Sequence, residues 1–296
     1  MGILHNLALR PMRRVGLVVL PEKVVLRWSH EYAKKRYHRF LEQRVSPEWL
    51  VSGVQDGPAM SNRLRLLTRS LDEQFYESEY SDDQFFYESY RQAYHFSTLL
   101  EKFDFNFRTC GAILDFGCGS ARILRLFRYI SGVRLVGADA NPECIQWCIE
   151  NVPGCQFHLN PLDPPLTFSK GNEFGLIVAL SVFTHIPLHQ QTEWLEEMKR
   201  ILRPGGILLC TVVGTSHFNA QLGTEAKRLL NQQGEVTLGK DDPGVSFSTK
   251  AGGSQFDVFQ RRDKVIDVFG RVLKMLDYIP SSRAPIGQDL LVLQKI

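Results

Sequence analysis

The residues best suited to chemistry are two aspartates that flank a glycine turn. In residues 111–122 (GAILDFGCGSAR) a short apolar run ends in Asp115, and a turn with Gly117 and Gly119 follows. Such glycines let a ligand approach the backbone, and the start of a following helix offers unpaired N–H groups. A carboxylate before the turn repels a pyrophosphate, and no phosphate-loop lysine follows. The pattern predicts a cofactor that carries a cationic amine.

The second aspartate, Asp139, lies 20 residues beyond the second glycine of the turn and directly follows the apolar run 134–138. A carboxylate at this place can accept hydrogen bonds from both hydroxyls of a ribose. Two plainer interpretations exist, because Asp139 could cap the helix that opens at 141–142 and Asp115 could be a turn residue. The joint occurrence of Asp115, Asp139 and the two glycines favours a nucleoside-containing cofactor.

The elements that must position these residues follow from hydrophobic periodicity. Apolar runs alternate with helical patterns, which predicts βαβ units and a parallel sheet with helices on both faces. The expected strands are 112–116, 134–138, 156–159, 174–180 and 206–213, and the expected helices are 121–130, 142–151 and 188–202. After a helix near 262–269, strands 271–279 and 289–295 are expected to pair as an antiparallel edge hairpin, because their connection is too short for a crossover helix.

This seven-stranded, doubly wound, Rossmann-like α/β fold brings polar residues to one edge. Ligands of such sheets bind at the carboxyl ends of the strands. Asp115, Asp139, Asn160 and Ser181 stand at the ends of the first four expected strands. The sequence therefore predicts one cofactor site along that edge.

The first 95 residues differ from the rest and are expected to form a helical N-terminal extension to a domain at 96–296. Positions 10–44 contain ten basic residues and only three acidic ones, and residues 28–45 have a helical pattern with aromatic residues. Such a helix can rest on an anionic membrane or on RNA, or it can simply be a solvated helix that caps the main domain. The acidic, aromatic block 72–96 packs onto the core, or its aromatic residues cover a cofactor or line a substrate cleft, where Tyr90 is a candidate contact.

Composition narrows the remaining choices. A net charge of +3 is too small to indicate a nucleic-acid partner by itself. The six cysteines lack the spacing of a metal site, so we expect buried thiols, no bound metal and a reducing cytoplasmic location. No apolar run reaches the ~20 residues that a transmembrane helix needs. The irregular insertion at about 214–260 leaves from a strand's carboxyl end and is expected to form a substrate lid.

Five ordered motifs resemble the class I S-adenosylmethionine-dependent methyltransferases, in particular the type 11/12 methyltransferase-domain group. The resemblance covers about residues 90–296. It rests on 113–120 (ILDFGCGS), 136–142 (VGADANP), 181–185 (SVFTH), 202–206 (LRPGG) and 287–293 (GQDLLVL). One position departs from the group, since Ala121 stands where a third glycine is common; its methyl group either crowds the cofactor or improves the following helix.

The resemblance implies that S-adenosyl-L-methionine is the cofactor and assigns a role to each matching residue. Asp115 would lie near the amino group, and the turn Gly117-Cys118-Gly119 would pass beneath the methionine part. Asp139, with Ala140 beside it, would hold the ribose hydroxyls. The remaining assignments are Asn160, Pro161 and Leu162 around the adenine and Ser181 facing the methyl group.

A catalytic base is useful if the acceptor is a hydroxyl, and His185 follows the fourth expected strand. His185 could equally pack beneath the site; His189 and Tyr90 are further candidates for contact with the acceptor. The leading hypothesis is a methyltransferase for the hydroxyl or amine of a small molecule such as a sugar. The alternatives are an RNA or protein methyltransferase that docks through the basic segment, and a non-catalytic scaffold with possible peripheral membrane contact.

Overall fold

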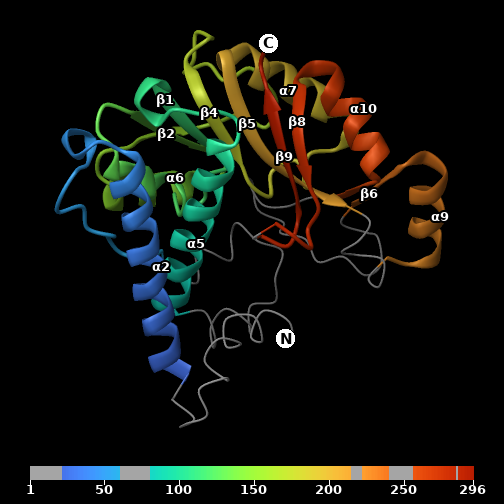
Figure 1. Ribbon diagram of the computed structural model, residues 1–296. Helices are drawn as coiled ribbons and strands as arrows, with labels where there is room; N and C mark the ends of the chain where they lie inside the picture. The colour runs from blue at the N-terminus through green and yellow to red at the C-terminus, as the bar shows by residue number, and fades with distance from the viewer. Residues whose placement is uncertain (1–21, 61–80, 215–221, 240–255, 285) are drawn as a thin grey trace.

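Five parallel strands form from the apolar runs that the sequence predicts. The computed structural model describes residues 22–60, 81–214, 222–239, 256–284 and 286–296. Within them the parallel strands lie in the order β3-β2-β1-β4-β5 (Figure 1). Their bounds are β1 (Ala112–Phe116), β2 (Arg134–Asp139), β3 (Gln156–Leu159), β4 (Phe174–Ala179) and β5 (Leu202–Gly214). All five predicted strands are confirmed. The chain runs outward from β1 through β2 to β3 and then returns across the sheet to β4, so the switch point in strand order lies between β1 and β4.

The expected edge hairpin is also confirmed. β8 (Lys274–Ile279) pairs antiparallel with β9 (Asp289–Gln294), and β9 pairs antiparallel with β5. The prediction of seven strands is too low, because the insertion supplies a second hairpin, β6 (Glu235–Gly239) with β7 (Phe256–Gln260). β7 runs parallel to the last two residues of β5 and brings the described sheet to nine strands.

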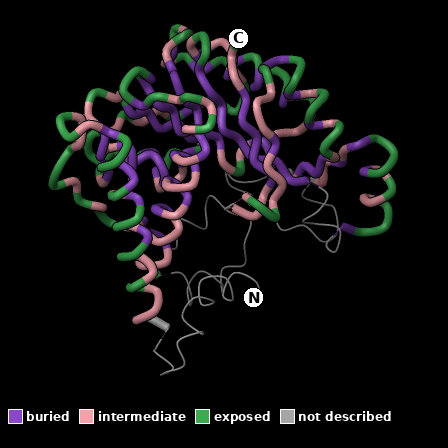
Figure 2. Tube along the Cα trace, viewed as in Figure 1, coloured by how far each residue is buried: buried purple, intermediate pink, exposed green. Residues whose placement is uncertain are grey.

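Helices cover both faces of the sheet, as the alternation predicts. One face packs on α7 (Leu188–Ile201) and α10 (Arg262–Val272), through Trp194, Leu195 and Phe269. The other face packs on α6 (Pro142–Asn151) and on the N-terminal helices α2 (Glu22–Arg44) and α5 (Asp82–Glu101). Figure 2 shows the central strands buried between these two layers. The remaining elements are α9 (Thr224–Gln233) and the 3-10 helices η2 (Pro47–Trp49) and η3 (Phe107–Thr109).

The N-terminal extension shares its core with the sheet. Tyr37 and Leu41 of α2 and Phe96 of α5 belong to the same buried cluster as Ile113 of β1. α5 begins at a Ser81 cap, whose side chain accepts a hydrogen bond from the Gln84 backbone N–H, and runs without a break to Glu101. The domain boundary expected at residue 95 therefore falls inside a helix, and the extension is continuous with the rest of the core.

The helix predicted at 121–130 is confirmed only in part. A 3-10 helix, η4 (Leu124–Tyr129), stands there, and Ala121 has the left-handed φ of 51°. The carbonyl of Ala121 accepts hydrogen bonds from both the backbone N–H and the side chain of Arg125. The Arg125 guanidinium also donates a hydrogen bond to the Ser120 carbonyl. Ala121 lies outside any helix, so its methyl group does not improve one.

Several expectations fall on residues outside the described ranges. They include the first part of the basic segment, the aromatic residues at 75–80 and the centre of the predicted lid at 240–255. Among the described helices, none is both long and apolar enough to cross a bilayer.

Candidate functional site

The glycine turn is fixed to the end of the neighbouring strand. The backbone N–H groups of Gly117 and Cys118 both donate to the Ala138 carbonyl, at 2.8 and 3.0 Å. Gly117 and Gly119 have left-handed φ values of 73° and 50°, which glycine adopts without strain. A side chain at Gly117 would also collide with Val182 of the loop after β4. The turn is therefore held between β2 and that loop.

Asp139 ends β2 and joins the turn to the next helix. One carboxylate oxygen accepts the Gly119 N–H at 2.8 Å, and the other accepts the Asn141 N–H at 2.8 Å. Asn141, not Asp139, caps α6, because its side chain accepts the N–H groups of Glu143 and Cys144. Burial raises the pKa of Asp139, while these N–H donors pull it down. Asp139 is thus a carboxylate held beside the glycine turn rather than a helix cap.

Asp115 lies at the carboxyl end of β1, in register with Gly137 of β2 and Val178 of β4. Only 6% of the residue is exposed. Burial raises the pKa of Asp115 to about 7, and the nearby Asp139 charge adds to the rise, whereas the Leu124 N–H and Arg122 oppose it. A carboxyl group with this pKa is half protonated near neutral pH and gains from a cation placed beside it.

Beyond β3, a buried polar atom lies next to exposed apolar side chains. Asn160 is buried, and its Oδ1 atom has no hydrogen-bond partner among the described residues. Leu162, two residues on, is 62% exposed, and Pro161 between them is also exposed. An unpaired buried acceptor is costly unless a ligand supplies the donor. An apolar wall with such an acceptor suits a flat ring that carries an amino group.

Together these groups fit S-adenosyl-L-methionine. Two buried carboxylates match a cationic amine and a pair of hydroxyls, and the unpartnered Asn160 oxygen matches a ring amine. All lie at the carboxyl edge of the sheet, where the fold places ligands.

Ser181 occupies a strained position just past β4. Its φ is 57°, which a serine adopts only when its surroundings enforce it. The Ser181 N–H donates to Thr211 Oγ1 at 2.7 Å, and both hydroxyls donate to Oε1 of Gln288, at 3.0 and 2.7 Å. Sequence reasoning missed Thr211 and Gln288 as supports of this turn, although Gln288 stands within the 287–293 motif.

His185 lies in the loop that Ser181 begins. Its Nδ1 atom is 3.1 Å from Oδ1 of Asp257 on β7, and both side chains are about a quarter exposed. The Val258 N–H donates to the Thr184 carbonyl at 2.8 Å, so β7 is attached directly to this loop. A carboxylate on one ring nitrogen orients a histidine, as catalytic bases require. The sequence did not reveal Asp257, because β7 was not predicted.

The two other candidates for acceptor contact differ in position. His189 is exposed in the first turn of α7. Tyr90 of α5 is fully buried, and its hydroxyl contacts the Asp56 carboxylate and the Tyr129 hydroxyl. With its hydroxyl engaged in this way, Tyr90 belongs to the contact between α2, α5 and η4.

The six cysteines are free thiols, and all except Cys155 are buried. Cys118 of the glycine turn lies beside Cys148, and the Cys148 thiol donates a hydrogen bond to the Gly119 carbonyl at 3.2 Å. That contact to Cys148, together with burial, raises the pKa of Cys118, so the thiol is a poor nucleophile. It supports the turn through packing.

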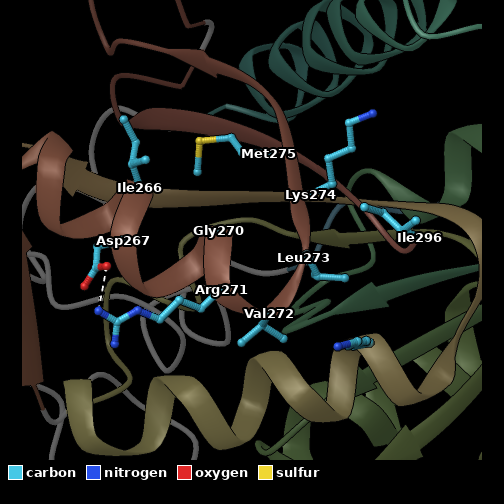
Figure 3. A pocket seen from close by; sticks show the side chains of 10 residues that line it. Ile266, Asp267, Gly270, Arg271, Val272, Leu273, Lys274, Met275 and Ile296 are labelled. Atoms are coloured by element: carbon cyan, nitrogen blue, oxygen red, sulfur yellow. Dashed lines mark hydrogen bonds and ion pairs between the residues drawn. The ribbon is translucent and has the colours of Figure 1, made fainter.

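A surface groove lies at the opposite, amino edge of the sheet. Ten residues from α7, α10, β8, the connecting Leu273 and Ile296 line it. Lys199 is one of them, and Figure 3 labels the other nine, which include Lys274 and Met275. An ion pair of 2.7 Å joins Arg271 to Asp267 beside it. None of the candidate cofactor residues lines this groove, so it is distinct from the site at the carboxyl edge.

Comparison with known proteins identifies the family to which this chain belongs. A family model described as "Methyltransferase domain" matches residues 87–238, just over half of the chain. A S-adenosylmethionine-dependent methyltransferase from Methanosarcina mazei is 14% identical, with a TM-score of 0.50, over 67% of this chain and 97% of that chain. A protein from Pyrococcus horikoshii is 15% identical, with a TM-score of 0.50, over 75% of this chain and 99% of that chain. At this identity the structural likeness concerns the fold, while the family match includes the glycine turn, Asp139, Asn160 and Ser181.

Proposed function

We propose that this chain, which belongs to the methyltransferase-domain family, transfers a methyl group from S-adenosyl-L-methionine to a hydroxyl or amine of a small molecule. The observation that carries the proposal is the pair of buried carboxylates, Asp115 and Asp139, on either side of a glycine turn at the carboxyl edge. A protein that kept the fold only as a scaffold would gain nothing from burying two acids there.

Each candidate residue at this edge would bind a different part of the cofactor. Asp115 would pair with the cofactor's amino group, and Asp139 would accept its ribose hydroxyls while the Gly119 and Asn141 N–H groups hold the carboxylate in place. Cys118 and Ala140 would contribute backbone and packing next to these two groups. Asn160, Pro161 and Leu162 would enclose the adenine. Since each group is fixed by the protein before binding, little ordering is left to be done.

The loop after β4 faces the reacting end of the site. Bound S-adenosyl-L-methionine would supply a methyl group on a sulfonium, open to in-line attack by an acceptor oxygen or nitrogen, with S-adenosyl-L-homocysteine as the leaving group. The task of the protein is then to align the acceptor and to exclude water. Ser181 holds the loop in its strained turn, and His185 would remove the proton from an acceptor hydroxyl. His189, exposed in the first turn of α7, remains a predicted acceptor contact. The buried Tyr90 hydroxyl is engaged by Asp56 and Tyr129, so Tyr90 is not proposed as an acceptor contact.

The test is a transfer assay with methyl-labelled S-adenosyl-L-methionine and a cell extract, which is then separated into small-molecule, RNA and protein fractions and read by mass spectrometry. The expected product is a metabolite that gains one methylene unit and carries the label. Asp139→Asn provides the matched inactive control. Label found only in RNA or protein fractions would instead favour the macromolecular alternative, and no transfer to any fraction would favour a scaffold.

A second proposal concerns contact of the N-terminal helix with an anionic membrane. The outer face of α2 exposes Trp28 by 53% and Tyr32 by 65%, and the exposed Lys35 and Arg39 continue this face. Aromatic rings beside cations are typical of helices that lie on bilayer surfaces. Vesicles with anionic lipid should retain the protein and release it on substitution of Trp28 and Tyr32 by alanine. Equal binding to neutral vesicles, or no binding at all, would contradict this proposal.

A further inference from the structure

Arg125 of η4 is a cation buried completely within the protein. None of its surface is exposed, and its guanidinium lies over the rings of Phe85 and Trp147. Burial lowers the pKa of Arg125 to about 10, so the group remains charged at neutral pH. Among the described residues, the hydrogen-bond acceptors of its side chain are all backbone carbonyls. A charge buried at this cost indicates that its position has a specific purpose.

Those carbonyls come from two segments that lie far apart in the sequence. On one side, Arg125 Nη2 donates to the Ser120 carbonyl at 2.8 Å and Nε donates to the Ala121 carbonyl at 3.3 Å. Both carbonyls lie at the end of the glycine turn, and residues 117–121 are called the cofactor turn below. On the other side, Nη1 donates to Asp56 at 3.1 Å and to Pro58 at 2.8 Å, both in the N-terminal extension. One guanidinium therefore connects the extension to the turn.

The segment around Asp56 is itself held firmly. The Asp56 carboxylate accepts hydrogen bonds from Lys34 of α2 at 2.6 Å, from Tyr90 of α5 and from Tyr129 of η4 at 3.2 Å. Burial pushes the pKa of Asp56 up, but these donors outweigh it and the net pKa is lowered. The Asp56 carboxylate thus joins α2, α5 and η4. It does so in the segment whose carbonyls, at Asp56 and Pro58, accept hydrogen bonds from Arg125.

The other end of the connection is the strained part of the turn. Ala121 has a φ of 51° and is completely buried. A left-handed alanine is strained and persists only where the surroundings enforce it. The hydrogen bonds from Arg125 to the Ser120 and Ala121 carbonyls provide that enforcement. This explains how a turn with alanine in place of a third glycine keeps its shape.

We propose that Arg125 is a positioning residue, through which the N-terminal extension holds the cofactor turn in its binding shape. The extension is then a working part of the methyl-donor site. This inference rests on the proposed function for its ligand, S-adenosyl-L-methionine.

The test compares the affinity for S-adenosyl-L-methionine, by titration calorimetry, with the melting temperature of the protein without ligand. Arg125→Met keeps the aliphatic stem and removes all the donors, and we expect Kd to rise about tenfold or more. Arg125→Lys keeps the charge but cannot bridge both segments, and an intermediate Kd is expected.

Arg128 offers a matched control. It donates to the Gln55 and Pro153 carbonyls at 2.8 and 3.3 Å, and to the Arg125 carbonyl, but not to the cofactor turn. Arg128→Met should lower the melting temperature while leaving Kd within about twofold of wild type, since it loses a similar number of hydrogen bonds. If Arg125→Met acted only through a general loss of stability, Arg125→Met and Arg128→Met would raise Kd by the same factor, which would contradict this inference.

Asp56→Asn tests the connection from its far end and also serves if Arg125→Met does not fold. It should weaken binding although its side chain contacts none of the candidate cofactor residues. Combined with Arg125→Lys it should add less than its separate effect, because both act through one path. Wild-type affinity in the Arg125 variants and in Asp56→Asn would overturn this inference alone. No binding by wild type would overturn the proposed function as well.

Discussion

Asp115→Asn should make the protein more stable and its cofactor binding weaker. Burial raises the pKa of Asp115 to about 7, so above neutral pH the folded protein must hold an ionised carboxylate in a dry place. Asparagine has nearly the same shape and no charge. The stabilisation follows from removing the buried charge, and the loss of affinity follows from removing the partner of the cofactor's amino group.

The expected size follows from the shift in pKa. The pKa rises from 3.8 to about 7, a difference of roughly 3 units at about 1.4 kcal/mol each. The folded protein binds this proton more tightly than the unfolded chain, so the free energy of unfolding falls as pH rises from about 4 to about 7. At pH 8 the ionised group costs up to ~4 kcal/mol. Loss of a charged hydrogen-bond partner should raise the cofactor Kd by roughly 10- to 100-fold.

Two measurements check this prediction. Denaturant unfolding without ligand should show that the variant gains stability over wild type at pH 8 and that the gain disappears near pH 4. Titration calorimetry should show that wild-type affinity rises with pH up to about 7, because binding favours the ionised carboxylate, and that binding releases a proton below this pH. Asp115→Asn should lack this dependence.

Asp56→Asn is the control of opposite sign. Despite burial, the donors around Asp56 lower its pKa, so its charge stabilises the folded protein above pH 4. This variant should lose stability at pH 8. If Asp115→Asn also loses stability there, or if it binds S-adenosyl-L-methionine as tightly as wild type, the role assigned to Asp115 is refuted.

Two further substitutions probe the turn and the loop after β4. Ala121→Gly should change the free energy of unfolding by less than ~1 kcal/mol, since relief of the left-handed backbone offsets the lost buried methyl group. Ala121→Val should cost more than ~2 kcal/mol, because a β-branched side chain resists this conformation. Urea unfolding measures both, and equal effects would contradict the explanation. His185→Ala should reduce methyl transfer to a hydroxyl acceptor by roughly 100-fold or more while the cofactor Kd stays unchanged. Unchanged turnover with that acceptor would exclude His185 as the base.

Much of the fold followed from hydrophobic periodicity, because parallel strands and their helices are specified locally. The runs at 112–116 and 174–179 are apolar apart from Asp115, and every residue in them is buried in the sheet. The carboxyl ends of these strands then placed Asp115, Asp139 and Asn160 at one edge without any knowledge of contacts. That reasoning depends on topology alone.

The errors arose where tertiary contacts override a local pattern. The apolar spacing at 121–130 resembles that of an α-helix. In the structure the Arg125 side chain donates hydrogen bonds to the carbonyls of Ser120 and Ala121, and the left-handed conformation of Ala121 prevents a helix from starting there. β6 and β7 are five residues each and were hidden in a polar insertion, although Val236 and Leu238 alternate with polar neighbours as a strand requires. Asp257 was missed with its strand.

Arg125 itself could not be found from sequence. A single arginine within an apolar pattern is usually a solvated residue, and its purpose depends on carbonyls about 70 positions away at Asp56 and Pro58. Likewise, the boundary drawn at residue 95 followed a change in composition, whereas α5 continues through it to Glu101.

The most direct measurement is a calorimetric titration of S-adenosyl-L-methionine into the full chain and into its Asp139→Asn variant. We expect one saturable site per chain in wild type and a Kd roughly 10- to 100-fold higher in the variant, because a charged acceptor of the ribose hydroxyls is lost. No binding by the folded wild-type protein, or equal affinity in both proteins, would contradict a methyl-donor site at the carboxyl edge of this sheet.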